Sequence, residues 1–338
     1  MMQSYGNATK LRAALPVLAL AMAVPLTGGV PAAHAAGGKP IAQTCGPKHH
    51  YVIGFSQVDF TEPYRQHVDN EMQQLVKQYP QFKLLIADGQ ASDNTQTSQV
   101  ENYITQRVDM LFISPYESAP LTPVVSRAYK AGIPVVELDR KTLGNDYTTF
   151  VGGDNFQIAK QAGEYAAETL LPEGGEIAIL EGLPSSSPAT ERLAGFKAGI
   201  AGNPKLKVVA VQPVDWMEDK AVTVFSAILQ AHPDIKLVYT SNDLAAAGAY
   251  IAVKGAGKLG QVKIIGTDGL PGPAGGIRAV AEGQWAATYI YPTGAAQALD
   301  IAKKILIDCA ASVPKAVTVA TQRVDPSNAK GLYAKLKF

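Results

Sequence analysis

The stretch YVIGFSQVDFTEPYRQHVDNEMQQLVKQYPQFKLLIAD, residues 51–88, contains the pattern that governs the rest of the chain. It opens with the apolar run YVIGFS at residues 51–56 and closes with FKLLIAD at residues 82–88. Between these runs, Thr61 is suited to cap a helix that has Pro63 in its first turn, and apolar residues then recur at helical spacing. The stretch therefore predicts a strand, a helix and a second strand, with both strands buried in a parallel sheet.

The same alternation continues to the end of the chain. Apolar runs separated by amphipathic segments stand at residues 109–114, 133–139, 148–154, 176–182, 207–213, 236–241, 261–268 and 287–291. The rhythm breaks at Gly152-Gly153-Asp154 and then restarts. We therefore predict an α/β protein with two doubly wound, Rossmann-like parallel-sheet domains.

The first 35 residues have the composition of a secretory signal peptide. Lys10 and Arg12 precede a long apolar stretch without charges, and Ala33-His34-Ala35 fits a small-x-small cleavage site. A transmembrane anchor is the alternative, but prolines and glycines interrupt the apolar run. We expect cleavage after Ala35 and export to the periplasm.

Composition excludes several functional classes. Of 338 residues, 30 are Lys or Arg and 29 are Asp or Glu, and a net charge of +1 argues against nucleic acid as a partner. Two cysteines are too few for a four-thiolate metal site, and the five histidines lack metal-ligand spacing, so we expect neither a metal nor a cofactor. In an oxidising periplasm Cys45 and Cys309 could form a disulfide, with two separate free thiols as the alternative.

One glycine pattern imitates a nucleotide-binding loop. Gly255, Gly257 and Gly260 have G-x-G-x-x-G spacing, but they follow a predicted helix and precede a strand. A Rossmann loop has the opposite order, so we interpret these glycines as the end of a helix.

Polar side chains gather where the predicted strands end. In doubly wound sheets, ligands bind beyond the carboxyl ends of the strands. The residues at these ends include carboxylates, amides, hydroxyls, an arginine and aromatic rings. Carboxylates and guanidinium groups bind pairs of hydroxyls, and aromatic rings cover the apolar face of a sugar, so this mixture favours a neutral polyhydroxylated ligand.

Several motifs in this order resemble the periplasmic sugar-binding proteins of the ribose and galactofuranose type, which serve bacterial ABC transporters. The motifs are IGFSQV (53–58), IADGQ (86–90), GIPVVELDR (132–140), GGDN (152–155), ERLAGF (191–196), QPVDW (212–216), SNDLAAAGA (241–249) and IGTDGLPG (265–272). The resemblance covers nearly the whole chain after the signal peptide. It implies the fold of a type I periplasmic binding protein, with two domains joined by a three-segment hinge.

The resemblance also implies a set of ligand-binding residues. They are Phe55, Ser56, Gln57, Tyr64, Arg65, Ser114, Asp139, Arg140, Thr190, Trp216, Asn242, Asp268 and Tyr291. Three positions depart from the ribose type: Ser114 replaces an Asn, Thr190 stands where that type has a ligand-binding Arg, and Thr267 replaces an aromatic residue. We do not take the nearby Arg192 as a substitute for that arginine.

The implied organisation divides the chain between two lobes. We expect the N-terminal lobe at residues 36–153 plus 292–325 and the C-terminal lobe at residues 154–291 plus 326–338. The hinge segments are expected near residues 152–154, 290–293 and 324–327. A small neutral sugar or polyol would close the lobes, and the closed monomer would deliver it to a membrane permease.

Three other functions are alternatives to transport. A sensor on the same scaffold would present its ligand state to a chemoreceptor or histidine kinase. A carbohydrate-active enzyme would need a carboxylate pair, which Asp139 and Asp268 could imitate, but no catalytic motif is present, so we predict no enzyme. A sugar-responsive repressor is disfavoured because a signal peptide stands in place of a DNA-binding headpiece.

Overall fold

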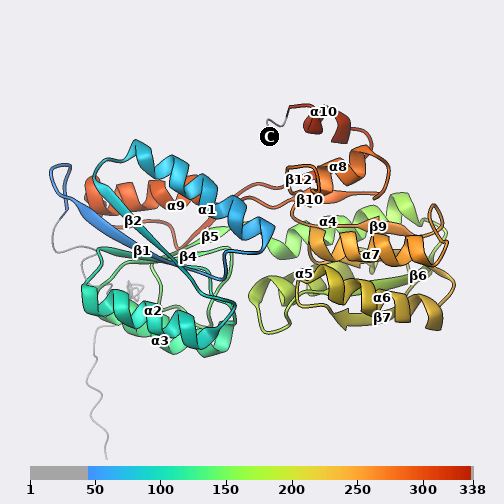
Figure 1. The fold of residues 1–338 in the computed structure, drawn as a ribbon, viewed down its shortest axis with the longest axis horizontal. Helices are drawn as coiled ribbons and strands as arrows, with labels where there is room; N and C mark the ends of the chain where they lie inside the picture. Colours follow the sequence, from blue (N-terminus) through green and yellow to red (C-terminus); the bar gives the residue numbers. More distant parts are fainter. Residues whose placement is uncertain (1–44, 336–338) are drawn as a thin grey trace, which may run out of the picture. The chain divides into compact units, whose positions relative to one another are not determined.

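Two parallel sheets form the framework of the computed structural model, which describes residues 45–335 (Figure 1). The first sheet has the strand order β11-β5-β4-β3-β1-β2, and all its pairings are parallel. Its strands are β1 (Tyr51–Gln57), β2 (Phe82–Asp88), β3 (Met110–Ile113), β4 (Val135–Leu138), β5 (Thr149–Gly152) and β11 (Ala316–Thr318). The predicted signal peptide, residues 1–35, lies outside the described residues.

Helices cover both faces of the first sheet. In Figure 1, α1 and α9 lie on one face and α2 and α3 on the other. These helices are α1 (Pro63–Leu75), continued by the 3₁₀ turn η1 (Val76–Gln78), α2 (Asp93–Gln106), α3 (Ser118–Lys130) and α9 (Ala295–Ala302), continued by the π-helical turn η3 (Lys303–Ile307). Successive residues of one strand enter different cores: Phe112 packs with α1 and α9, whereas Ile113 packs with α2 and α3. Burial on both faces explains why the strands show no apolar–polar alternation.

The second sheet repeats this plan with the strand order β7-β6-β8-β9. Its parallel strands are β6 (Gly175–Glu181), β7 (Leu206–Pro213), β8 (Ile235–Thr240) and β9 (Lys263–Ile265). Figure 1 shows α4 and α5 on one face and α6 and α7 on the other. The helices are α4 (Asn155–Tyr165), continued by the π-helical turn η2 (Ala166–Leu170), α5 (Ser187–Ile200), α6 (Glu218–Ala231), α7 (Asp243–Gly255) and α8 (Gly276–Ala281). The predicted α/β class with doubly wound parallel sheets is confirmed.

The chain's last elements are short. Strand β10 (Thr288–Ile290) pairs antiparallel with β12 (Gln322–Val324), and the final helix α10 (Ala329–Tyr333) packs beside α8. Strands β11 and β12 were not predicted, because they are mostly exposed and do not form the buried apolar run that marks the equally short β9 and β10. No helix in the range 45–335 has the length and apolarity needed to cross a membrane.

One helix start differs from the prediction. The N-cap of α1 is Glu62, whose side chain accepts hydrogen bonds from the backbone N–H groups of Tyr64 and Arg65. Thr61 instead donates its backbone N–H to the carboxylate of Asp59, 2.8 Å away. The two carboxylate oxygens of Glu62 thereby satisfy two of the backbone donors that the start of a helix leaves unpaired.

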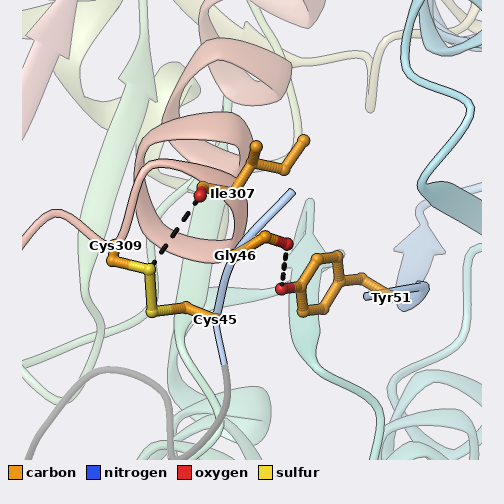
Figure 2. Close-up of a disulfide and its surroundings, with 5 residues drawn as sticks. All are labelled: Cys45, Gly46, Tyr51, Ile307 and Cys309. Carbon is orange, nitrogen blue, oxygen red and sulfur yellow. Dashed lines mark hydrogen bonds between the residues drawn. A yellow bond between two sulfur atoms is a disulfide. The ribbon is translucent and has the colours of Figure 1, made fainter. Parts of the chain in front are cut away.

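A disulfide joins Cys45 to Cys309, so the predicted pairing is confirmed (Figure 2). The two Cα atoms are 5.5 Å apart, although 264 positions separate the residues in the sequence. Beside this bond, Tyr51 donates its hydroxyl to the carbonyl of Gly46, 2.9 Å away (Figure 2). The start of the described chain is therefore fastened to the segment that follows η3.

Candidate ligand-binding site

A cavity of about 1070 Å³ lies at the carboxyl ends of the strands. Its lining comes from the segments that follow β1, β2, β3 and β4 in the first sheet and β6, β7, β8 and β9 in the second. In both sheets the strand order reverses direction, between β1 and β3 in one and between β6 and β8 in the other. Ligands of doubly wound proteins bind at such switch points, so the cavity is the candidate site.

Three buried charges form the first wall of the cavity. Asp139 follows β4, where its backbone N–H still pairs with Val151 of β5 at 2.9 Å and its φ of 67° then turns the chain. Arg65, from the first turns of α1, places Nη1 2.6 Å from the Asp139 carboxylate. Arg140 donates from Nη1 to the carbonyl of Tyr116, 2.9 Å away, while its Nε has no hydrogen-bond partner among the described residues.

Burial and neighbouring charges shift the pKa values of Asp139 and Arg140. Burial alone would raise the pKa of Asp139, but Arg65 and Arg140 hold it below its ordinary value. Burial and the positive charge of Arg65 lower the pKa of Arg140 to about 10. The first wall therefore presents one carboxylate between two guanidinium groups.

The second wall contains Arg192 on α5 and Asp268, which follows β9. Nη1 of Arg192 lies 3.5 Å from the Asp268 carboxylate and donates to the carbonyl of Ser241 at 2.5 Å. Asp268 has a φ of 124°, a conformation that side-chain-bearing residues rarely adopt. Burial raises the pKa of Asp268 well above its ordinary value, and Arg192 counteracts this only in part.

Asn242 stands at the N-cap of α7 in the same wall. Its side-chain oxygen accepts from the backbone N–H of Ala245 at 3.0 Å, and its Nδ2 donates to the carbonyl of Trp216 at 3.0 Å. The amide thus caps a helix and fixes the loop that carries the indole.

Trp216 contributes the aromatic surface of the cavity. The guanidinium carbon of Arg140 lies 5.4 Å from the centre of the indole and that of Arg192 lies 5.8 Å from it. The indole N–H is buried without a hydrogen-bond partner among the described residues. An indole with two guanidinium groups within about 6 Å of its centre is held in place and can offer a face to the C–H groups of a ligand.

Seven of the thirteen residues predicted to bind ligand line this cavity: Tyr64, Arg65, Asp139, Arg140, Trp216, Asn242 and Asp268. They come from both sheets, although up to 204 positions separate them, as the residue numbers show. These residues meet because the carboxyl ends of strands from both sheets border the same cavity.

Five other predicted residues lie buried outside the cavity lining. They are Phe55, Ser56, Gln57, Ser114 and Tyr291. Ser114 accepts a hydrogen bond from Arg65 at 3.1 Å, and Gln57 donates to Asp69 on α1 at 2.7 Å. These residues support the wall of the cavity.

The other three buried residues of this group also make specific contacts, namely Phe55, Ser56 and Tyr291. Phe55 packs edge to face against a phenylalanine of β3, with ring centres 6.3 Å apart, and Ser56 donates to Gln99 at 2.7 Å. The ring of Tyr291 meets that of Tyr64 edge to face at 5.7 Å. The Tyr291 hydroxyl accepts from the backbone N–H of Gly153 at 3.2 Å.

Thr190 is the one predicted residue that is exposed. Its hydroxyl donates to the carbonyl of Ser187 one turn earlier in α5. Pro188 and Arg192, four positions apart, line the cavity on the same helix. Residues four apart share a helix face and residues two apart do not, which places Thr190 away from the cavity and Arg192 within it.

Sequence reasoning set Arg192 aside, and the predicted set of binding residues also omitted six carboxylates that line the cavity. These lining residues are Asp59, Glu62, Asp88, Asp215, Glu218 and Asp219. Asp88 ends β2, and Asp59 and Asp215 stand two positions after β1 and β7, which was the available signal for these three. The other three carboxylates lie at the start of the helix that follows a strand. The spacing of Pro188 and Arg192 was the signal for the arginine.

Comparison with known proteins places the chain in a family. The model of the periplasmic binding protein domain matches residues 53–308, three quarters of the chain. The chain belongs to the periplasmic binding protein family. The resemblance to sugar-binding proteins of this family and the type I fold are confirmed.

Three relatives of this periplasmic binding protein are informative. The ribose import binding protein of Bacillus subtilis (strain 168) is 36% identical over 224 residues, covering 66% of this chain and 72% of the relative. The fructose-binding periplasmic domain of a hybrid two-component system has a TM-score of 0.81 and 35% identity, covering 85% of this chain and 94% of that one. A Mycobacterium smegmatis protein in complex with β-D-fucofuranose has a TM-score of 0.79 and 28% identity, covering 84% and 94%. The relatives are binding proteins, so the prediction that the chain is not an enzyme is confirmed.

Proposed function

We propose that this periplasmic binding protein captures a small neutral monosaccharide, a pentose or a hexose, and delivers it to an ABC transporter permease. The observation that carries the proposal is the pairing of Arg65 with Asp139 and of Arg192 with Asp268 on opposite walls of one cavity. Carboxylates accept hydrogen bonds from sugar hydroxyls, and guanidinium groups donate to them in a planar fork. The Trp216 indole would cover the apolar C–H face of the sugar.

The balance of buried charge supports a neutral ligand. Each of the two guanidinium groups just named has a carboxylate within ion-pair distance. Glu62 approaches Arg65 at 3.6 Å, and further acidic residues line the cavity. An anionic ligand would meet these carboxylates with no excess of positive charge to compensate them.

A furanose ring is part of the proposal. Two features support it: the FSQV motif at residues 55–58 with Tyr64 and Arg65 nearby, and the structural similarity to the fucofuranose complex. Arg65 lines the cavity, whereas Phe55, Ser56 and Gln57 lie behind its wall.

The lobes and hinge predicted from the sequence complete the mechanism. In this proposal, residues 36–153 plus 292–325 form one lobe, and residues 154–291 plus 326–338 form the other. The sugar closes them because it makes contacts with both walls only in the closed form. The permease then recognises the closed monomer in the periplasm.

A sensor is the second candidate function, and a specific similarity favours it. The fructose-binding domain described above belongs to a two-component system. On the same scaffold, closure around a sugar would be presented to a signalling partner instead of a permease.

Thermal unfolding against a sugar panel tests the proposal. The exported chain is refolded to remove carried-over ligand and is mixed with pentoses, hexoses, furanose-forming sugars, sugar acids and polyols. A ligand at about a thousand times its Kd adds roughly 4 kcal/mol of stability, which raises Tm by several degrees. Stabilisation by a neutral sugar is expected, and a response confined to sugar acids or an unresponsive panel would contradict the proposal.

Two site variants sharpen this test. Asp139→Ala and Asp268→Ala should each abolish most of the stabilisation, because each removes a carboxylate that accepts from the sugar and balances the nearest guanidinium group in the cavity. Asp234→Ala, on an exposed loop before β8, serves as the control and should respond like the wild type. Wild-type sugar responses in both site variants would show that the ligand binds elsewhere.

A further inference from the structure

Asn155, the first residue of α4, uses both ends of its side-chain amide in buried contacts. The residue is 1% exposed. Its Oδ1 accepts from Nε of Arg192 at 2.8 Å, and its Nδ2 donates to the carboxylate of Glu191 at 3.1 Å. The start of α4 does not require this amide, because Asp154 caps the helix by accepting from the backbone N–H of Gln157 at 2.9 Å.

The Asn155 contact fixes the orientation of the cavity arginine. With Nε held by Asn155 and Nη1 held by the carbonyl of Ser241, the planar guanidinium group cannot rotate. Its carbon lies 4.7 Å from the ring centre of Tyr291, which closes one face. Within residues 45–335, no hydrogen bond engages the remaining terminal nitrogen, Nη2, which leaves that donor for a ligand.

The Glu191 contact leads from Asn155 to the other sheet. Glu191 forms an ion pair with Lys141, whose Nζ lies 2.5 Å from its carboxylate. Lys141 directly follows Arg140 of the first wall, and its backbone N–H donates to the hydroxyl of Ser187 on α5 at 2.9 Å. A continuous chain of polar contacts thus runs from Arg192 through Asn155 and Glu191 to the loop after β4.

We propose that Asn155 is a positioning residue that holds Arg192 in its sugar-binding orientation and couples it to the Lys141–Glu191 contact between the two sheets. The inference rests on the proposed sugar-binding function of the cavity. In this arrangement, a sugar that engages Arg192 strengthens the contact between the sheets, and that contact slows the release of the sugar. Asparagine suits the position because it offers one acceptor to a cation and one donor to an anion.

Three variants separate the two halves of this role. Asn155→Ala removes both contacts. Asn155→Asp keeps an acceptor for Arg192 but sets a second carboxylate against Glu191. Asn155→Asp together with Glu191→Gln restores a donor opposite the new carboxylate, while the amide oxygen introduced at position 191 still accepts from Lys141 in place of the ion pair, so the rescue is partial. Gln157→Ala, an exposed amide removal on the same helix, is the matched control.

The measurement is the association and dissociation rate of the sugar identified by the panel, followed in stopped flow by intrinsic tryptophan fluorescence. For Asn155→Ala we expect affinity to fall roughly 10- to 100-fold, mostly through faster dissociation, since one buried hydrogen bond to a charged group is lost. Asn155→Asp should dissociate faster than the wild type, and the added Glu191→Gln should reverse part of this loss. The control should match the wild type.

A double-mutant cycle tests the coupling itself. Lys141→Ala and Asn155→Ala should be non-additive in sugar affinity, because both interrupt the same chain of contacts. Circular dichroism and Tm identify variants that fail to fold. If Asn155→Ala fails to fold, the test rests on comparing the sugar dissociation rates of Asn155→Asp and of Asn155→Asp combined with Glu191→Gln.

The outcomes distinguish this inference from the function on which it rests. A wild type that binds no sugar would overturn the proposed function and the inference with it. A wild type that binds sugar, alongside Asn155 variants with unchanged rates or an additive cycle, would overturn the inference alone.

Discussion

Asp139 and Asp268 were both predicted to bind ligand hydroxyls, but their surroundings give the two carboxyl groups different pKa values. Arg65 and Arg140 hold the pKa of Asp139 below its ordinary value despite burial. Burial instead raises the pKa of Asp268 well above its ordinary value, and the single arginine beside it only partly counteracts this. One carboxyl is therefore an acceptor for hydroxyl groups, and the other holds a proton more readily and can also donate.

A third buried carboxyl, Asp69 on α1, gives a pH prediction at the residue scale. Burial raises its pKa to about 6, although Gln57 donates a hydrogen bond to it at 2.7 Å. A folded-state pKa above the unfolded value of about 3.9 means that stability falls as pH rises from about 4 to 6, because the folded chain binds the proton more tightly. Asp69→Asn keeps an acceptor for Gln57 and removes this titration.

We therefore expect the unfolding free energy of Asp69→Asn, relative to the wild type, to increase between pH 4 and pH 7 by up to about 2 kcal/mol. Urea unfolding at intervals across this range measures the difference. The exposed Asp234→Asn should show no such trend. A constant difference between Asp69→Asn and the wild type would mean that Asp69 titrates normally in the folded chain.

At the scale of single elements, the ends of strands and helices determine the site. Strand β6 ends at Glu181, and Gly182 then passes directly beneath the indole of Trp216. A Cβ atom at Gly182 would lie 2.2 Å from the ring carbon Cη2, far inside contact distance. Trp216 itself has a φ of 70°, so its loop has little freedom to move aside.

Gly182→Ala should therefore displace the indole from the cavity wall. We expect sugar affinity to fall about tenfold or more and stability to fall by about 1–3 kcal/mol, which is typical of overpacking. The measurement is a sugar titration followed by the emission of Trp216, with the other tryptophan removed by Trp285→Phe. Gly202→Ala is the control, since nothing lies within 4 Å of a Cβ atom there. Wild-type affinity in Gly182→Ala would show that the indole does not contact the sugar.

At the scale of the whole molecule, two parallel sheets that share the order of four strands supply opposite walls of one cavity. The chain leaves the first sheet after β5, builds the second, and returns through α9 to add β11 beside β5. The Cys45–Cys309 disulfide closes nearly all of this path into one loop.

This disulfide gives a prediction for the whole chain. Denatured, unreduced protein should contain no reactive thiols, and reduction should release two. The double variant Cys45→Ser, Cys309→Ser should unfold at a lower temperature, because a cross-link across so long a loop is worth up to about 5 kcal/mol in the chain-entropy model. Two reactive thiols before reduction would show that the cysteines do not pair.

Local patterns in the sequence were sufficient for the architecture and for part of the site. Unbroken apolar runs predicted buried parallel strands. The strand ends together with the family resemblance then indicated Asp139, Arg140, Trp216, Asn242 and Asp268, all of which line the cavity. Strand periodicity and turn chemistry depend on neighbouring residues, so a single sequence contains them.

Only the tertiary structure decided which distant side chains meet. It placed Arg192 in the cavity and Thr190 outside it, because two residues a half-turn apart on α5 face different directions. It brought Asn155 between Arg192 and Glu191, and it decided between a disulfide and two free thiols for Cys45 and Cys309. Such contacts depend on how helices pack on the sheets and on which strands become neighbours, and neither the spacing nor the type of a residue states these in advance.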